Sequence, residues 1–134
     1  MNRLVGTITA LQTNDTLSLV NMAVDEFVFT TIVIDTPETV PYLEIGKKVA
    51  LFFKETEVIL ATRDILELSI QNKIPGKISA LKEGKLLSEV TIDIGKHKLK
   101  SVITTAATQQ LKLKVNDVVW ALIKTNEISI ASND

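Results

Sequence analysis

With 134 residues, of which 46% are hydrophobic and 23% charged, the chain is expected to form one ordinary globular domain or two very small ones, and not a disordered tail. Fifteen Lys and Arg against sixteen Asp and Glu give a net charge of −1, which provides no basic excess for binding a nucleic-acid backbone. The absence of cysteine and the single histidine exclude disulfides, thiolate metal sites and multi-histidine zinc sites.

The start of the chain, MNRLVGTITA, is polar and lacks the apolar core of a signal peptide. No later apolar run reaches the roughly 18 residues that a membrane-spanning helix needs. We therefore expect a cytoplasmic protein with no membrane partner.

The sequence of residues 1–62 predicts a series of short strands and one helical turn. The turn is expected at Thr36-Pro37-Glu38, because proline suits the first position of a helix. The following stretch, TRDILELSIQNK, contains four large apolar residues and neither glycine nor proline. We expect residues 63–71 within it to form a connector that packs against a barrel and does not swing freely.

Residues 72–134 repeat the same plan. The segments KIPGKISAL and LLSEVTIDI are predicted strands joined by a glycine turn, and a second glycine turn leads into the strand LKSVIT. Thr104 or Thr105 is a candidate cap for a short helix over AATQQL, because a hydroxyl there accepts from free amides of the first turn. The segments VVWALIK and ISIA are the last predicted strands.

The two parts of the chain are related by a single ungapped shift, which places Leu4 on Ile74 and Gly6 on Gly76. It aligns twelve identical residues over the 58 positions from Leu4 to Ala61, where ordinary residue frequencies give roughly four. Five short strands and a helical turn in about 60 residues are typical of a small barrel. The chain is therefore predicted to be all-β, with two tandem five-stranded OB-like barrels. Because such small barrels have thin cores, we also expect a homo-oligomer.

The second repeat resembles a Mop domain, which is also called a molybdate-type TOBE domain. The segments that carry the resemblance are GKISALKEGKLLSEVTIDIG and VITTAATQQLKLKVNDVVWALIK. Two such domains in one chain are similar to the molbindins, and tandem domains of this type also occur in molybdate-responsive regulators. The resemblance implies a non-enzymatic protein without a catalytic cofactor, which binds molybdate or tungstate at domain interfaces for storage, homeostasis or sensing. It also implies a trimer of di-domain chains.

Such oxyanions are tetrahedral dianions that accept hydrogen bonds at neutral pH, so their site needs hydroxyls, amides and cations. The resemblance places donors in three segments, although the family's arginine is replaced by Gln71 and one of its serines by Ala107. The implied oxyanion-binding residues are Ser69, Gln71, Asn72, Thr104, Thr105, Ala107, Thr108, Lys124 and Thr125.

The first repeat offers two weaker candidates, Thr36 and Lys54. Glu55 follows Lys54, which is expected to face the loop that carries Asp35 beside Thr36, so carboxylates should repel a dianion there. Replacing Lys124 by alanine should therefore weaken molybdate binding about 10- to 150-fold, while the same change at Lys54 should alter it less than about threefold.

Two other functions remain open. The substitutions in the family's donor positions are compatible with a ligand-free regulatory or assembly domain that kept the fold. A nucleic-acid-binding OB module needs exposed stacking aromatics, whereas Trp120, Phe52 and Phe53 fall at predicted core positions and His97 in an exposed turn. An enzyme is disfavoured, because the chain shows no nucleophile–base pair, glycine-rich phosphate loop or metal-ligand cluster.

Overall fold

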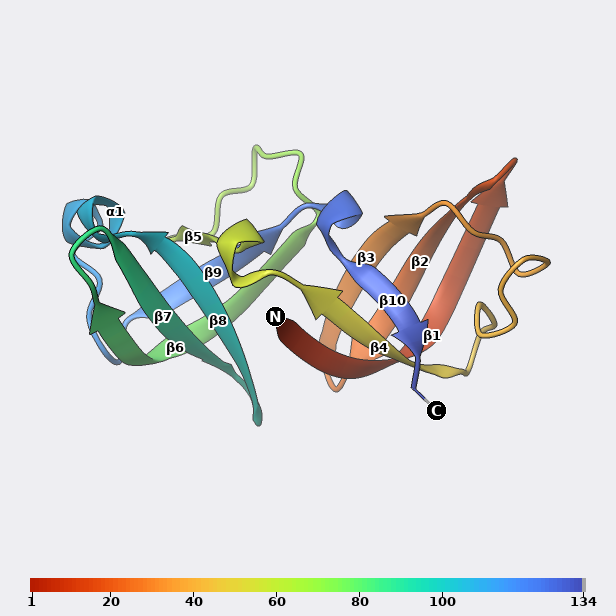
Figure 1. Ribbon diagram of the computed structural model, residues 1–134, viewed down its shortest axis with the longest axis horizontal. Coiled ribbons are helices and arrows are strands. Elements are labelled where there is room, and N and C mark those ends of the chain that lie inside the picture. The colour runs from red at the N-terminus through yellow and green to blue at the C-terminus, as the bar shows by residue number, and fades with distance from the viewer. Residues whose placement is uncertain (134) are drawn as a thin grey trace. The chain divides into compact units, whose positions relative to one another are not determined.

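A computed structural model of the chain describes residues 1–133, which form two five-stranded antiparallel sheets (Figure 1). The first sheet has the order β10-β4-β1-β2-β3 and consists of β1 (Asn2–Asn14), β2 (Leu17–Val24), β3 (Phe27–Val33), β4 (Lys48–Phe53) and β10 (Ser129–Ser132). The second has the order β5-β9-β6-β7-β8 and consists of β5 (Ile59–Ala61), β6 (Asn72–Glu83), β7 (Leu87–Ile94), β8 (His97–Thr104) and β9 (Val118–Ile123). The predicted all-β fold of two small barrels is confirmed.

Three short helical elements accompany the strands. They are the 3₁₀ turns η1 (Glu55–Glu57) and η2 (Thr125–Glu127) and the helix α1 (Thr105–Gln110). The helical turn predicted in the first repeat is a single turn, in which the Val40 amide donates to the Thr36 carbonyl at 3.0 Å. The helix predicted in the second repeat begins after Thr104, whose hydroxyl caps it.

The fifth strands are exchanged between the two repeats. Strand β10 comes from the second repeat and pairs with β4 of the first, while β5 comes from the first repeat and pairs with β9 of the second. Unit 1 therefore consists of Met1–Phe53 with the segment from Lys124 onwards, and unit 2 of Lys54–Ile123. The predicted boundaries of 1–62, 63–71 and 72–134 describe the sequence repeats, whereas each compact unit contains strands from both repeats.

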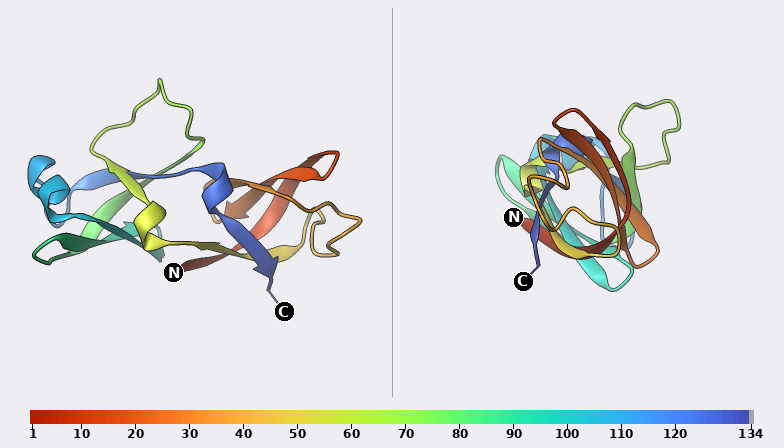
Figure 2. Two further views of the ribbon diagram at one scale, coloured as in Figure 1. Left: turned by 45° about the horizontal axis from the view of Figure 1, so that its top comes forward. Right: turned by 90° about the vertical axis from the view of Figure 1, so that its right-hand side faces the viewer.

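The connector of residues 63–71 also differs from the prediction of a packed segment. It has no helix or strand before Asn72, and Figure 2 shows it as a loop that projects from the strands of unit 2. Leu66 is 79% exposed, although Ile70 at the end of the loop is partly buried. Of the apolar residues that suggested packing, Leu66 is thus left largely uncovered by residues 1–133.

The repeat seen in the sequence is preserved in the backbone. The long first strand of each sheet has an irregularity at the same place, between Ile8 and Ala10 in β1 and between Ile78 and Ala80 in β6. Positive φ angles also recur at equivalent positions of the two repeats, at Asp25 and Gly95 and again at Gly46 and Asn116. These positions make tight turns, which require left-handed backbone.

The core of each unit is built from alternating strand residues. In β2 the buried apolar side chains are Val20, Met22 and Val24, and the equivalent residues of β7 are Val90, Ile92 and Ile94. Aromatic residues contribute mainly to unit 1, where the rings of Phe29 and Phe53 lie with centroids 6.3 Å apart. Of the other aromatic residues predicted to be in the core, Phe52 and Trp120 are only partly buried.

Buried hydroxyls hold the exchanged segments at equivalent places. The single hydroxyl proton of Thr31 in β3 is shared between the carbonyls of Thr125 and Ile128, whose oxygens lie 2.9 and 2.5 Å from the hydroxyl oxygen. At the equivalent position of the second repeat, Ser101 in β8 donates to the carbonyl of Val58 at 2.7 Å. Both hydroxyl residues are fully buried, so each satisfies backbone groups that cannot reach water.

Candidate functional site

The strand exchange divides the predicted oxyanion donors between the two units. Lys124 and Thr125 belong to unit 1, where they join Thr36 of the first repeat. Lys54 belongs to unit 2 and joins the donors of the second repeat. The remaining predicted residues all lie in unit 2, namely Ser69, Gln71, Asn72, Thr104, Thr105, Ala107 and Thr108.

The start of α1 keeps one predicted donor available. The Thr104 hydroxyl oxygen accepts from the Ala107 amide at 3.1 Å, which leaves the hydroxyl proton for another acceptor and commits the amide to the cap. Thr104 is exposed, and none of the hydrogen bonds within residues 1–133 uses its proton. This agrees with a residue that contacts a ligand.

Thr105 and Thr108 have structural roles. The Thr105 hydroxyl donates to the Gly84 carbonyl at 2.8 Å and contacts the Ser88 hydroxyl at 2.8 Å. The Thr108 hydroxyl donates to the Thr105 carbonyl at 2.7 Å. Both threonines are buried, so their hydroxyls anchor α1 to the β6–β7 turn and to its own first turn.

The predicted donors at and just before the start of β6 also fall into a structural group and a group that is available to a ligand. Asn72 is 1% exposed, and its side-chain amide donates to the Ile123 carbonyl at 3.0 Å, which ties β6 to the end of β9. Ser69 and Gln71 are exposed, and their side chains form no hydrogen bond with the described part of the chain. Ser69 and Gln71 can therefore donate to a ligand, whereas Asn72 positions the strand.

Lys54 and Lys124 occupy equivalent places in the two units. Each follows the last residue of a core strand, and its carbonyl accepts from the amide three residues later at 3.0 Å to begin a 3₁₀ turn. Both lysines are exposed, and within residues 1–133 neither ammonium group forms an ion pair. Thr125 is partly buried, and its carbonyl is held by Thr31.

The carboxylates near these lysines are arranged differently from the expectation. Asp35 was predicted to face Lys54, but it lies in unit 1, where it and Asn126 line one hollow of about 540 Å³. Asn126 is the second residue after Lys124, so this hollow lies beside the η2 turn that follows Lys124. Near Lys54, the 3₁₀ turn η1 carries the two carboxylates Glu55 and Glu57. Each lysine therefore shares its unit with nearby carboxylates.

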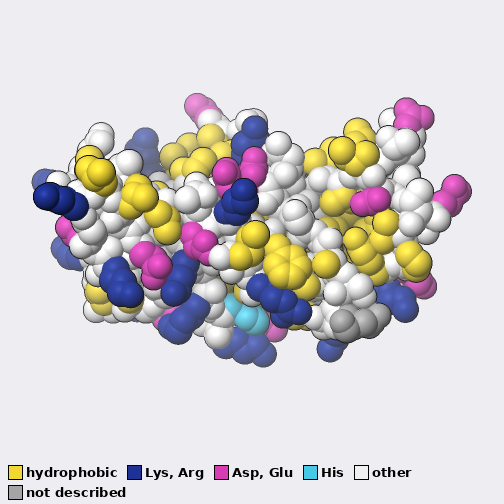
Figure 3. All heavy atoms as spheres, in the orientation of Figure 1, with side chains coloured by type: hydrophobic (Ala, Val, Ile, Leu, Met, Phe, Trp, Pro, Cys, Tyr) yellow, Lys and Arg dark blue, Asp and Glu magenta, His cyan; other side chains and the backbone are white. Residues whose placement is uncertain are grey.

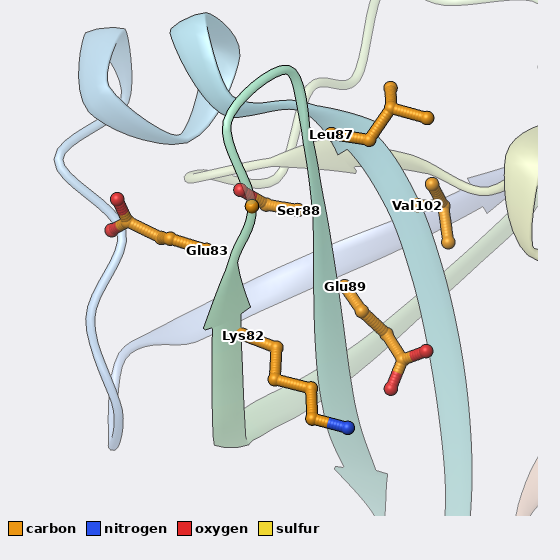
Figure 4. A pocket seen from close by; sticks show the side chains of 7 residues that line it. Lys82, Glu83, Leu87, Ser88, Glu89 and Val102 are labelled. Atoms are coloured by element: carbon orange, nitrogen blue, oxygen red, sulfur yellow. The ribbon is translucent and has the colours of Figure 1, made fainter.

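The hollows of the surface do not by themselves mark an oxyanion site. One of about 310 Å³ lies along the β6–β7 hairpin and β8, and Figure 4 shows side chains that line it, among them Lys82, Glu83, Leu87, Glu89 and Val102. Two carboxylates against one ammonium make this lining unfavourable for a dianion.

A second hollow of about 310 Å³ in unit 1 contains Tyr42, Lys47 and Lys48. Burial, assisted by the Asp35 carboxylate, raises the pKa of the Tyr42 hydroxyl, which donates to the Ile130 carbonyl at 3.3 Å. The two lysines make the lining positive, but Asp35 lies close enough to affect Tyr42 and to oppose an anion.

Among residues 1–133 there is no group of three or more His, Asp or Glu side chains placed to hold a metal ion. The same residues form no helix long and apolar enough to cross a membrane.

Sequence reasoning missed the two residues that hold the lysine-bearing turns, Thr31 and Ser101. The available signal is a polar residue at a buried position of each third strand, in FVFTTIV and in LKSVIT, at equivalent places in the two repeats. It indicates a buried hydrogen bond, but it does not identify the acceptor.

Residues 68–130 match the TOBE domain family. Molybdenum-pterin-binding protein 1 of Clostridium pasteurianum is 30% identical over 66 residues, which are 48% of this chain and 97% of that protein. Molybdenum-pterin-binding protein MopB of Rhodobacter capsulatus is 32% identical over 88 residues, and the molybdenum transport protein ModE of Herbaspirillum seropedicae is 31% identical over 75 residues. These matches cover 64% and 55% of this chain, but only 33% of MopB and 28% of ModE.

A solved structure of the cytoplasmic molybdate-binding protein ModG, with molybdate bound, has the same fold. Its TM-score is 0.91, and the match covers 98% of this chain and 95% of the ModG chain at 24% identity.

Proposed function

Because the chain belongs to the Mop/TOBE domain family, whose members are binding proteins and not enzymes, we propose that it binds molybdate as a cytoplasmic store or sensor of the oxyanion. The relatives named for molybdenum-pterin binding support molybdenum as the element of the ligand. The fold shared with ModG supports a protein that binds the free oxyanion. Tungstate is included in the proposal, since it has the same charge and tetrahedral shape and needs the same donors.

The observation that carries the proposal is the pair of exposed lysines at the ends of β4 and β9. A dianion that only accepts hydrogen bonds is stabilised by ammonium groups that are not already neutralised. Lys54 and Lys124 meet this condition within the described residues, and the buried hydroxyls of Thr31 and Ser101 hold the turns that follow them.

Neutral donors accompany the lysine of each unit. In unit 2, which contains Lys54, we assign this role to the hydroxyls of Thr104 and Ser69 and the side-chain amide of Gln71, and in unit 1, which contains Lys124, to the backbone amide of Thr125. Thr36 is the corresponding candidate in the first repeat, because its hydroxyl makes no hydrogen bond with residues 1–133 while its amide is held by Thr39 at 2.9 Å.

We further propose that the chain assembles as a homotrimer. Large apolar side chains are exposed on each unit, including Ile34 at 78% in unit 1 and Leu86 at 80% in unit 2, and Figure 3 shows hydrophobic side chains at the surface. Where such side chains lie together in one patch, they support a contact between subunits. Light scattering should give about three times the 14.8 kDa chain mass, whereas a monomer at micromolar concentration contradicts the proposal.

Isothermal titration tests the proposed ligand. Molybdate and tungstate should bind, while phosphate should bind at least about tenfold more weakly. Phosphate is partly protonated at neutral pH and needs an acceptor that this donor set lacks. If molybdate and tungstate produce no heat and no shift in thermal stability, the protein is better described as a ligand-free assembly domain.

Variants of the two lysines test the site. Lys124→Ala should weaken molybdate binding about 10- to 150-fold, because a charged hydrogen bond to a desolvated anion is lost. Lys54→Ala should have the smaller effect, since Glu55 and Glu57 follow it directly, whereas η2 carries only Glu127. Because Asp35 lies in the same unit as Lys124, the difference should be less extreme than the sequence alone suggests. Titration of both variants with molybdate measures the two effects. A larger loss of affinity in Lys54→Ala than in Lys124→Ala would show that Lys54 is the main cation of the site.

A further inference from the structure

The polypeptide passes between the two units at two points, between Phe53 and Lys54 and between Ile123 and Lys124. A cut within residues 62–71 would leave both of these points intact. It would produce one fragment that carries β1–β5 and another that carries β6–β10. Neither fragment would contain a complete five-stranded sheet, because each keeps the strand that completes the sheet of the other.

The exchanged strands are bound by backbone pairing. In unit 1, β10 pairs with β4 from Ser129 opposite Phe52 to Ser132 opposite Val49. In unit 2, β5 pairs with β9 from Ile59 opposite Leu122 to Ala61 opposite Trp120. Separating the fragments therefore requires breaking a strand pairing in both units.

The segments that precede the exchanged strands are also anchored in the core. Val58 is 1% exposed and Ile128 is 2% exposed, and each lies just before an exchanged strand. The carbonyl of Val58 is bound by Ser101, and that of Ile128 is bound by Thr31. Each anchor joins a residue of one repeat to a residue of the other, so it would connect the two fragments after a cut.

The connector itself contributes few contacts. Residues 62–69 are all exposed, and the hydrogen bonds described for the loop are those of Lys73, which reaches the Ile65 carbonyl at 2.9 Å and the Asp64 carboxylate at 3.4 Å. An exposed salt bridge of this length contributes little to stability. Exposed loops without regular structure are also the preferred places for cleavage.

From these contacts we propose that the chain consists of two mutually completing halves, residues 1–65 and 66–134, and that strand exchange, not the connector, holds them together. Each half is the binding partner of the other, with the exchanged strand as the ligand and the open edge of β4 or β9 as its receptor. A protein cut between Ile65 and Leu66 remains one folded particle. It also keeps its oxyanion site, and this last statement rests on the proposed function.

The test is a cut in the complete folded protein. A recognition sequence for a site-specific protease is inserted between Ile65 and Leu66, and the purified protein is cleaved to completion. A denaturing gel should show two fragments, while size-exclusion chromatography under native conditions should show them eluting together. Fragments that elute separately while both keep the circular dichroism of β-sheet would overturn the proposal.

An experiment with increasing urea distinguishes strand exchange from a simple contact between the surfaces of two folded fragments. If the strands are exchanged, the fragments should dissociate only over the urea range in which the sheet signal is lost. Dissociation at a urea concentration that leaves the sheet signal intact contradicts the exchange. The paired variants Thr31→Val and Ser101→Ala should move dissociation and unfolding to lower urea together, because they remove the anchors. If the variants shift fragment dissociation and sheet unfolding by different amounts of urea, this also contradicts strand exchange.

Titration with sodium molybdate adds a separate readout. The cut protein should bind within about threefold of the intact chain's affinity. If neither the cut nor the intact protein binds molybdate, the proposed function is refuted, but the association of the two halves is not. Binding by the intact chain alone, with the fragments still associated, would refute the claim that the cut particle keeps its site.

Discussion

Gly76→Ala is expected to destabilise the protein by about 2–3 kcal/mol, which would make it among the most damaging single methyl additions in the chain. A Cβ at Gly76 would lie 2.6 Å from the Asp93 carbonyl oxygen and 2.5 Å from Cγ2 of Ile92. The carbonyl belongs to the backbone of β7, which pairs with β6, so it cannot move without disturbing the pairing. Urea unfolding followed by circular dichroism measures the loss.

The repeat provides a matched control for this substitution in Gly6, the equivalent residue of β1. A Cβ at Gly6 would meet the Ala23 carbonyl and Cγ2 of Val24 at 3.1 Å, distances that small shifts relieve. Gly6→Ala should therefore change stability by no more than about 1 kcal/mol, because the tighter contact is offset by the lower entropy of the unfolded chain. Equal losses at the two glycines would show that local space does not determine the cost.

Phe53→Ala should cost about 3–5 kcal/mol, because it removes a large side chain that is 1% exposed and leaves a cavity in the core. It also removes the ring contact with Phe29, whose centroid lies 6.3 Å away. The control is Phe52→Ala on the opposite face of the same strand. Phe52 is partly buried and lies 5.7 Å from the Arg3 guanidinium, so its removal should cost clearly less.

Unfolding of both variants in urea gives the comparison. A loss at Phe52 equal to that at Phe53 would contradict the assignment of Phe53 to the core. Phe53→Ile offers a further check, because isoleucine is the residue at the equivalent position of unit 2, Ile123, where it is fully buried. This variant should retain most of the stability, since it replaces most of the lost volume.

The fold could be predicted because the relevant signals are local. Alternating apolar residues in LLSEVTIDI predict one buried face, and Val90, Ile92 and Ile94 are indeed buried. The glycine and asparagine turns are local in the same sense, since Gly95 and Asn116 have the positive φ angles that such turns need. Each signal depends on a few neighbouring residues and not on the rest of the chain.

The exchange of the fifth strands could not be predicted, and the reason is the repeat itself. The segments around Lys54 and Lys124 share Glu57 with Glu127 and Ala61 with Ala131. A strand that fits the edge of one barrel therefore fits the other almost equally, so local pattern does not identify its partner. The assignment of Lys54 and Lys124 to units depends on this choice, and it places Asp35 in the same unit as Lys124 and in a different unit from Lys54.

Individual donors of the candidate site were also beyond the reach of sequence pattern. Thr104, Thr105 and Thr108 are the same residue type within five positions, yet Thr104 is exposed and the other two are buried with their hydroxyl protons used internally. The difference arises from the geometry of α1 and its contact with the β6–β7 turn. A motif records the residue type and not the direction in which the hydroxyl points.

The exchanged final strand has a consequence for biosynthesis. Strand β4 is complete at Phe53, but its neighbour β10 is synthesised after the other nine strands of the two sheets. One side of β4 in unit 1 therefore stays unpaired until Ser129–Ser132 have left the ribosome. Unit 2, in contrast, has all of its residues available once Ile123 has emerged. Hydrogen exchange on nascent chains stalled before Ser129 should find β4 unprotected along that edge, and protection there would contradict this order. Of the two units, unit 1 is thus the first to begin synthesis and the last to be completed.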